Sequence, residues 1–249
     1  MNKREKEHFI SLLFKMAKGF YVDIHAYTVM SNHFHILLTG LHEAAERADR
    51  KELLTRYQNI YGKKVLPPEG SYRINGELIP DTDAGTERLR YRLGSVSAFI
   101  GELKHRFSRW YNHRHNRKGY LWSDRFKSVI IEKGDPALIC SAYIDLNAVR
   151  AGIVQRPEDY RWSSIGFRVR NPRKAQQVLT AVKGIEIKRI PMVDLESGLL
   201  KIREEQFEKA IGFSVYRGFL YMSGSRKIEG KQMIPRSIYA EVLHLNGKL

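Results

Sequence analysis

Residues 20–39, FYVDIHAYTVMSNHFHILLT, carry the pattern that decides the fold. The first half, 20–30, is β-branched, aromatic and partly alternating, which is typical of a strand. Ser31 and Asn32 are turn residues, and 33–39 have the composition of a second strand. The sequence therefore predicts a β-hairpin over 20–39.

Outside this hairpin, apolar residues recur mostly at helical spacing. Asp135 and Pro136 have the residue types of a helix start, so we expect Asp135 to cap the last of these helices. A further strand is predicted over 126–132, and the class is therefore α+β, an antiparallel sheet with flanking helices. The predicted helices cover 4–18, 42–61, the stretch from Ser95 past Trp110, and 136–150.

Turn residues and basic residues divide the rest of the chain. Residues 63–94 have little periodicity, which indicates an inserted segment. Within it, SYRINGELI predicts a small hairpin. Residues 166–249 form a basic region with weaker patterning, for which we expect a helix near 200–211 and strands near 215–228. The predicted organisation is a domain over 1–165 followed by a basic accessory region over 166–249.

Charge is the most informative part of the composition. The 249 residues contain 43 Lys and Arg against 27 Asp and Glu, a formal net charge of +16. Such a surplus attracts polyanions, of which nucleic acid is the commonest. No apolar run is long enough for a membrane helix, and the single cysteine, Cys140, excludes an internal disulfide. We therefore expect a cytoplasmic protein that binds nucleic acid and no membrane.

His33 and His35 flank Phe34 on the second predicted strand. Residues two apart on a strand face the same side, so both imidazoles are placed to share one divalent metal ion. His113 and His115 have the same spacing, but a charged residue separates them in a basic stretch. The first pair is therefore the better metal candidate, and the alternative is that it is simply two surface histidines.

Tyr143 and Asn147 are four residues apart on the predicted helix 136–150, and Arg150 lies near the same face. A tyrosine can act as a nucleophile whose aryl oxide leaves readily, which makes a phosphotyrosine reversible. The amide oxygen of Asn147 could complete the shell of a metal beside the two imidazoles. The ordinary alternative is a tyrosine that packs and an asparagine that makes a local hydrogen bond.

Residues 101–133 combine nine Lys or Arg with three Asp or Glu, interleaved with aromatic residues. Basic groups follow phosphates, and aromatic faces stack on unpaired bases. The same pattern also fits a helix with an aromatic core face and a solvated basic face. The aromatic residues are Phe107, Trp110, Tyr111, Tyr120, Trp122 and Phe126.

Four motifs in this order resemble those of the single-tyrosine HUH transposases, in particular the REP-associated tyrosine transposases of bacteria. The resemblance covers residues 4–165, and the motifs are specific in combination rather than singly. They are AYTVMSNHFHILL at 26–38, GYLWSDRFKS at 119–128, YIDLNAVRAGIV at 143–154 and PEDYRWSS at 157–164.

The resemblance implies a ferredoxin-like sheet and an enzyme that cleaves and joins single-stranded or hairpin DNA through a 5′-phosphotyrosine. It assigns Tyr143 as the nucleophile and His33, His35 and Asn147 as ligands of a divalent ion, Mg²⁺ or Mn²⁺. The expected DNA contacts are Lys104, Arg109, Arg125, Lys127 and Arg150.

This chain departs from the family pattern at its start and in the insertion over 63–94. The family opens with a strand before the first helix, whereas here the helix begins almost at Met1, so we expect that strand to be missing. An unpaired edge is costly, so either 215–228 fills the vacant position or the edge stays open and activity is weak.

Two other functions remain open from the sequence. One is a degenerate module that holds DNA or RNA without cutting it, and the other is a different HUH nuclease, such as a replication initiator. The sequence also leaves open whether the chain is a monomer or a dimer.

Overall fold

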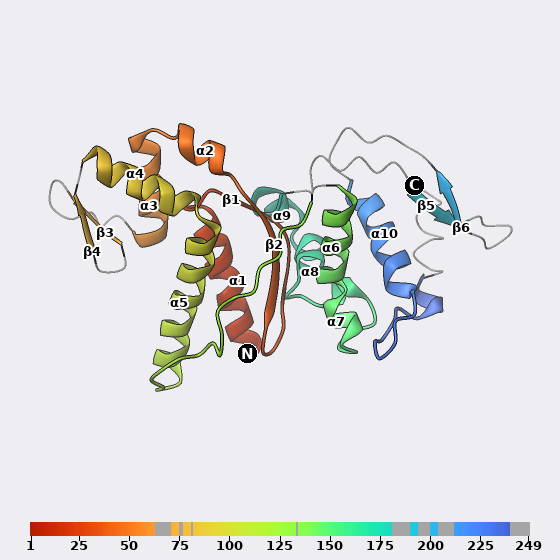
Figure 1. The fold of residues 1–249 in the computed structure, drawn as a ribbon. Coiled ribbons are helices and arrows are strands. Elements are labelled where there is room, and N and C mark those ends of the chain that lie inside the picture. Colours follow the sequence, from red (N-terminus) through yellow and green to blue (C-terminus); the bar gives the residue numbers. More distant parts are fainter. Residues whose placement is uncertain are drawn as a thin grey trace. The chain divides into compact units, whose positions relative to one another are not determined.

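The hairpin expected over 20–39 is confirmed (Figure 1). Strand β1 covers Val22–Val29, strand β2 covers Phe34–Gly40, and the two pair with each other. The Met30 amide donates to the His33 carbonyl at 2.8 Å, which closes the turn between them. Most of β1 is buried, whereas β2 is half-buried.

The structure is a computed structural model. It divides into two compact units, and the β1–β2 hairpin contributes residues to both. Unit 1 consists of Met1–Ile24 and Leu38–Ser128, and unit 2 consists of His25–Leu37 and Val129–Leu249. The division therefore does not follow the boundary expected at residue 165. The residues described are 1–62, 71–74, 77–80, 82–132, 134–180, 190–193, 200–203 and 212–239.

Unit 1 is built on helices with well-formed starts. Asn2 and Glu5 form a capping box at α1, and Ser95 caps α5 by accepting from the Ala98 amide. The two helices lie side by side and pack Phe9 against Phe107, with ring centroids 5.3 Å apart (Figure 1). The elements of this unit are α1 (Lys3–Ala17), α2 (His42–Arg47), α3 (Arg50–Tyr61), β3 (Ser71–Ile74), β4 (Glu77–Pro80), α4 (Asp83–Gly94) and α5 (Val96–Arg114).

Two predictions for unit 1 are corrected. The single helix expected over 42–61 is two helices, because Asp49 caps α3 by accepting from the Glu52 amide at 2.7 Å. The segment 63–94 contains the expected hairpin, β3 paired with β4, but it also contains helix α4, which begins at a Thr82 cap. Helix α4 is weakly amphipathic, so the spacing of its apolar residues did not predict it from the sequence.

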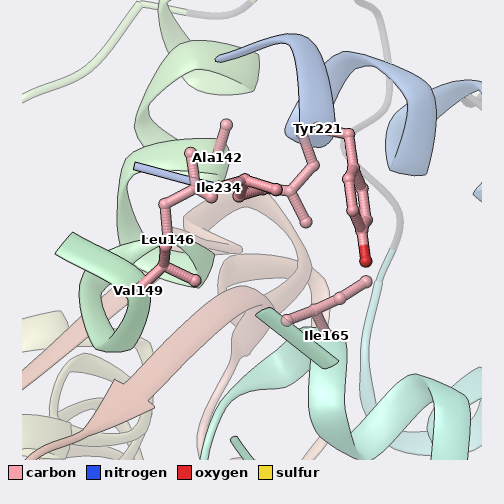
Figure 2. Close-up of a cluster of buried hydrophobic side chains, with 7 residues drawn as sticks. Ala142, Leu146, Val149, Ile165, Tyr221 and Ile234 are labelled. Atoms are coloured by element: carbon pink, nitrogen blue, oxygen red, sulfur yellow. The ribbon is translucent and has the colours of Figure 1, made fainter. Parts of the chain in front are cut away.

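Unit 2 packs helices from distant parts of the chain around one cluster of buried side chains (Figure 2). Ala142, Leu146 and Val149 face Leu220 and Tyr221 across this cluster. The elements of this unit are α6 (Asp135–Asp145), α7 (Asn147–Arg150), the short 3₁₀ helix η2 (Pro157–Asp159), α8 (Ser164–Arg170), α9 (Pro172–Val178), β5 (Ile190–Val193), β6 (Leu200–Arg203) and α10 (Phe213–Ser225).

Helix 136–150 is interrupted, and its predicted cap is wrong. Helix α6 ends at Asp145 and α7 begins at Asn147, with Leu146 between them. Gly134, with φ of +90°, precedes α6, while Asp135 lies in the first turn and makes no side-chain cap bond. A positive φ is easy for glycine, so the chain enters the helix one residue earlier than expected.

The C-terminal predictions are also corrected. Residues 200–203 form strand β6, which pairs with β5, and the rest of the helix expected near 200–211 lies outside the described residues. The stretch predicted as strands, 215–228, is mostly helix α10. Its buried residues Leu220, Tyr221 and Gly224 are at helical spacing, so packing on α6 overrides their β-propensity.

No third strand joins the hairpin within the part of the chain that the structure describes. The strand expected over 126–132 is irregular, and β1 is the one strand that pairs with β2. The opposite edge of β1 is covered, because Thr28 bridges to Ser163 and the Val29 amide donates to the Trp162 carbonyl at 2.9 Å. The expectation that 215–228 fills a vacant position is therefore wrong.

Candidate functional site

The two histidines of the predicted metal site lie together at the start of β2. His33 is exposed just before the strand, and His35 is half-buried within it. Their ring centroids are 5.1 Å apart and the planes are inclined at 74°. The strand period thus brings both rings to one place.

Hydrogen bonding and burial bear on how the two imidazoles could bind a metal. The Asn32 side-chain oxygen accepts from Nδ1 of His33 at 2.8 Å, so Nε2 is the ring nitrogen left to bind a metal. Burial, together with the neighbouring His33, lowers the pKa of His35 and keeps its ring neutral. Neutral imidazoles are the form that ligates metals.

Tyr143 reaches the same place from a distant part of the chain. It lies on α6, 60% exposed, with its ring centroid 6.0 Å from that of His35. A largely exposed tyrosine beside the His35 imidazole is open to a bulky substrate such as a phosphodiester. The predicted nucleophile therefore neighbours one of the two predicted histidine ligands, and all three residues belong to unit 2.

Asn147 is the third predicted metal ligand, and it lies on a different helix from Tyr143. It begins α7, after the interruption at Leu146, and it is half-buried. No hydrogen bond or ring contact among the described residues joins Asn147 to His33 or His35. Its role as a third ligand stays a prediction.

The motif at 157–164 holds the hairpin against the helical part of unit 2. The Tyr160 hydroxyl donates to the Val29 carbonyl at 2.7 Å, and Tyr160 packs with Met30 and Ala148 in one buried cluster. Ala148 belongs to α7, so this contact links the end of β1 to the helices that carry Tyr143 and Asn147. It fixes the place of the histidines at the tip of the hairpin.

Asp145 is a site residue that sequence reasoning missed. Its carboxylate is 1% exposed and accepts from the Ser164 hydroxyl at 2.5 Å, the Ile165 amide at 3.0 Å and the Tyr216 hydroxyl at 2.7 Å. It ties α6 to α8 and α10, two residues after the predicted nucleophile. The available signal was a charged residue in an otherwise apolar stretch of helix.

The predicted phosphate ligand Arg150 has partners within the chain. Its guanidinium donates to the carbonyls of Ser223, Arg226 and Gln232 at 2.7, 2.9 and 3.1 Å. These bonds join α7 to the end of α10 and to the segment that follows it. Arg150 therefore supports the packing of α10, and its role as a phosphate contact stays a prediction.

The other predicted DNA contacts lie in unit 1. Lys104, Arg109 and Arg125 line one groove, and Lys127 is exposed in the irregular segment that follows. The structure thus brings three of the expected basic residues to one surface.

The second histidine pair is arranged differently from the first. His115 contacts Glu5 at 2.8 Å between Nε2 and the carboxylate, and its ring packs on Tyr111. His113 belongs to the last turn of α5, where residues two apart do not share a face. The 113/115 pair therefore differs from the 33/35 pair, whose rings lie together.

Two kinds of feature, a metal-binding cluster and a membrane-spanning helix, are absent from the part of the chain that the structure describes. Within the described ranges there is no group of three or more His, Cys, Asp or Glu side chains arranged for a metal ion. None of the helices in those ranges has the length and apolarity needed to cross a membrane.

Comparisons with known proteins do not identify a family. No protein-family model, curated protein or solved structure matches the chain. The resemblance to HUH transposases therefore stays a prediction from the four sequence motifs.

Proposed function

We propose that the chain cleaves and rejoins single-stranded DNA, with Tyr143 as the nucleophile beside a divalent ion at His33 and His35. One observation carries the proposal: the His35 ring lies 5.1 Å from His33 and 6.0 Å from Tyr143. Packing alone does not require two imidazoles beside a largely exposed tyrosine.

The bonds that form and break in the reaction belong to the tyrosine hydroxyl and a phosphodiester. The Tyr143 oxygen attacks phosphorus and loses its proton, a phosphotyrosyl bond forms, and the bond to the 3′ oxygen breaks to give a free 3′-hydroxyl. Attack by another 3′-hydroxyl reverses these bonds and releases the tyrosine. A bound Mg²⁺ or Mn²⁺ would polarise the phosphate and neutralise developing negative charge.

The donor set fits such an ion. His33 and His35 offer imidazole nitrogens, and Asn147 is the candidate for a third, neutral oxygen ligand. Ions of this kind keep several waters and leave positions for substrate phosphate oxygens. Imidazole ligands favour Mn²⁺ over Mg²⁺ at this site.

The finer details follow from the motif resemblance. Hairpin DNA as substrate, a ferredoxin-like sheet and a cytoplasmic location belong to the proposal. The order of the four motifs along the chain supports them, together with the net charge of +16.

The direct test is a covalent adduct. Incubation of the full chain with labelled single-stranded hairpin DNA and Mn²⁺ is expected to give a protein–DNA band on a denaturing gel. Tyr143→Phe keeps the ring and removes the nucleophilic oxygen, so the adduct should disappear while DNA binding remains. Adduct at the wild-type level from this variant would contradict the assignment.

The histidines are tested with a matched pair. His33→Ala and His35→Ala should each reduce adduct formation at least about 100-fold, a typical loss for a site that has lost a ligand or its support. A chelator should have the same effect on the wild-type chain. His113→Ala and His115→Ala have the same spacing and should cleave normally, and the reverse result would show that the wrong pair was chosen.

A second candidate is a DNA-binding protein that does not cut. The observation that favours it is that, within the described strands, β2 pairs with β1 alone, so the strand that carries His35 is supported on one side. A metal site works only when its ligands are held firmly. The adduct assay separates the two, since this candidate binds hairpin DNA and gives no adduct at any metal concentration.

A further inference from the structure

Unit 1 contains an open groove of about 640 Å³ between helix α5 and residues 119–125. Lys104 and Arg109 line it from the helix, and Tyr120, Trp122 and Arg125 line it from the segment that follows. These residues come from two segments of the chain, so the groove is made by the way the chain returns along α5. None of them belongs to the candidate site in unit 2.

Trp122 is held in place as part of the groove wall. Its indole nitrogen donates to the Lys104 carbonyl at 3.2 Å, and its ring packs against Phe107 at 5.8 Å between centroids. The ammonium of Lys104 donates to the Asp124 carbonyl at 2.9 Å. The Asn112 side chain also donates to the Gly119 carbonyl at 2.8 Å, so three hydrogen bonds attach segment 119–125 to α5.

Tyr120 is the unusual residue in this groove. Its side chain is 97% exposed, next to a Gly119 that has φ of +90°. Exposed aromatic surface is unfavourable in water, and the neighbouring half-buried Trp122 shows that this segment can pack a ring against α5. A tyrosine held at the rim of a basic groove has both faces available for stacking.

The charge of the groove is suited to an anion. Arg109 and Arg125 are both exposed, and neither side chain makes an ion pair or hydrogen bond within the described residues. Asp124 is the one acidic side chain among the lining residues. The groove therefore presents free guanidinium groups beside a free aromatic ring.

We propose that this groove binds unpaired nucleotides of single-stranded DNA, with a base stacked on Tyr120 and phosphates at Arg109 and Arg125. Stacking on an exposed ring needs a base whose face is free, which paired bases in a duplex do not offer. The choice of DNA rests on the proposed function, whereas the preference for unpaired nucleotides rests on the groove itself.

The test compares Tyr120 with a matched residue. Tyr91 on α4 is also highly exposed, at 82%, and does not line the groove. Binding of a fluorescent hairpin with an unpaired flank is measured in the Tyr143→Phe background, so cleavage plays no part. Tyr120→Ala should weaken binding roughly 5- to 140-fold, the usual range for loss of one stacked base. Tyr91→Ala and Tyr120→Phe should bind like the parent.

A change in the DNA gives the decisive control. With abasic sites in the unpaired flank, the parent protein should weaken to the level of Tyr120→Ala, and the variant should show no further loss. Equal binding by Tyr120→Ala and Tyr91→Ala on the intact flank would overturn the stacking site. If the parent protein bound the corresponding RNA more tightly than the DNA, the assignment of DNA as the ligand of the groove would be wrong.

These outcomes are independent of the chemistry in unit 2. A chain that forms no adduct but shows the Tyr120 effect would contradict the proposed function and leave the groove standing. A chain that forms adducts with Tyr120→Ala binding unchanged would do the reverse.

Discussion

At the scale of single residues, Asp145 is unusual because its carboxyl group is buried. A carboxylate at the end of α6 lies at the negative end of the helix dipole and is almost fully buried. Three donors from two other elements compensate it, as described above. Because Tyr143 precedes it on the last turns of the same helix, the network that holds Asp145 also positions the proposed nucleophile.

We expect Asp145→Ala to lower the free energy of unfolding by about 3 kcal/mol. It leaves the Tyr216 hydroxyl and the Ile165 amide without their acceptor, at about 1–3 kcal/mol for each buried group, whereas the Ser164 hydroxyl can still donate to the Tyr27 carbonyl at 3.3 Å. Asp145→Asn should cost less, because its oxygen still accepts and the Tyr216 hydroxyl can accept from the amide nitrogen. Urea unfolding measures both, and equal losses would contradict this account.

Comparing the wild-type chain with Asp145→Asn should also reveal a pH dependence of stability. Burial raises the pKa of the Asp145 carboxyl above its ordinary value of 3.8, although its hydrogen bonds offset part of the effect. The folded chain then holds this proton more tightly than the unfolded chain, so the contribution to stability is fully present at low pH. It is lost as the pH rises from 3.8 through the folded-state pKa. Wild type should therefore lose stability relative to Asp145→Asn over that interval, and a constant difference would argue against a raised pKa.

At the scale of elements, the packing of α10 distinguishes two glycines that a helix propensity scale treats alike. Gly224 is buried on α10, where a Cβ would lie 2.5 Å from Ile234 Cδ1 and 2.8 Å from Leu146 Cδ2. Gly101 is exposed on α5, where a Cβ would meet nothing within 4 Å. The first glycine allows two elements to approach, and the second has no such role.

Alanine at these positions should act in opposite directions. Gly101→Ala should raise the free energy of unfolding by about 0.5–1 kcal/mol, because alanine loses less backbone entropy in a helix. Gly224→Ala should lower it by about 1–3 kcal/mol through overpacking against Ile234 and Leu146. Thermal or urea unfolding of the two variants is the measurement, and stabilisation by both would show that α10 does not pack as described.

At the scale of the whole molecule, charge governs how tightly a polyanion is held. The surplus of +16 is spread along the chain, and three basic side chains converge on the groove of unit 1. Each phosphate contact with single-stranded DNA contributes a slope of about −0.7 to log K against log salt concentration. We expect a slope of about −2 or steeper for the full chain, measured by anisotropy over a salt series.

A change in the slope locates the contacts. Arg109→Ala and Arg125→Ala should each make the slope less steep by about 0.7. Arg4→Ala removes an exposed charge from α1 outside the groove and should leave the slope unchanged. A slope near zero for the wild-type chain would mean that the basic surface is not where DNA binds.

The amino-acid sequence by itself determined the parts of this protein that depend on local interactions. The β1–β2 hairpin follows from its alternating apolar residues and the Ser31–Asn32 turn, and α1 and α5 follow from helical spacing. It also predicted that His33 and His35 would lie together, because a strand repeats every two residues.

Tertiary structure decided what depends on partners distant in sequence. Residues 215–228 have strand-forming composition, yet 213–225 are helical because α6 offers their apolar face a surface to cover. The Asp145 network and the meeting of His35 with Tyr143 join segments that no local pattern connects. Local patterns report only near neighbours, whereas burial, and the hydrogen bonds that burial demands, are properties of the packed chain.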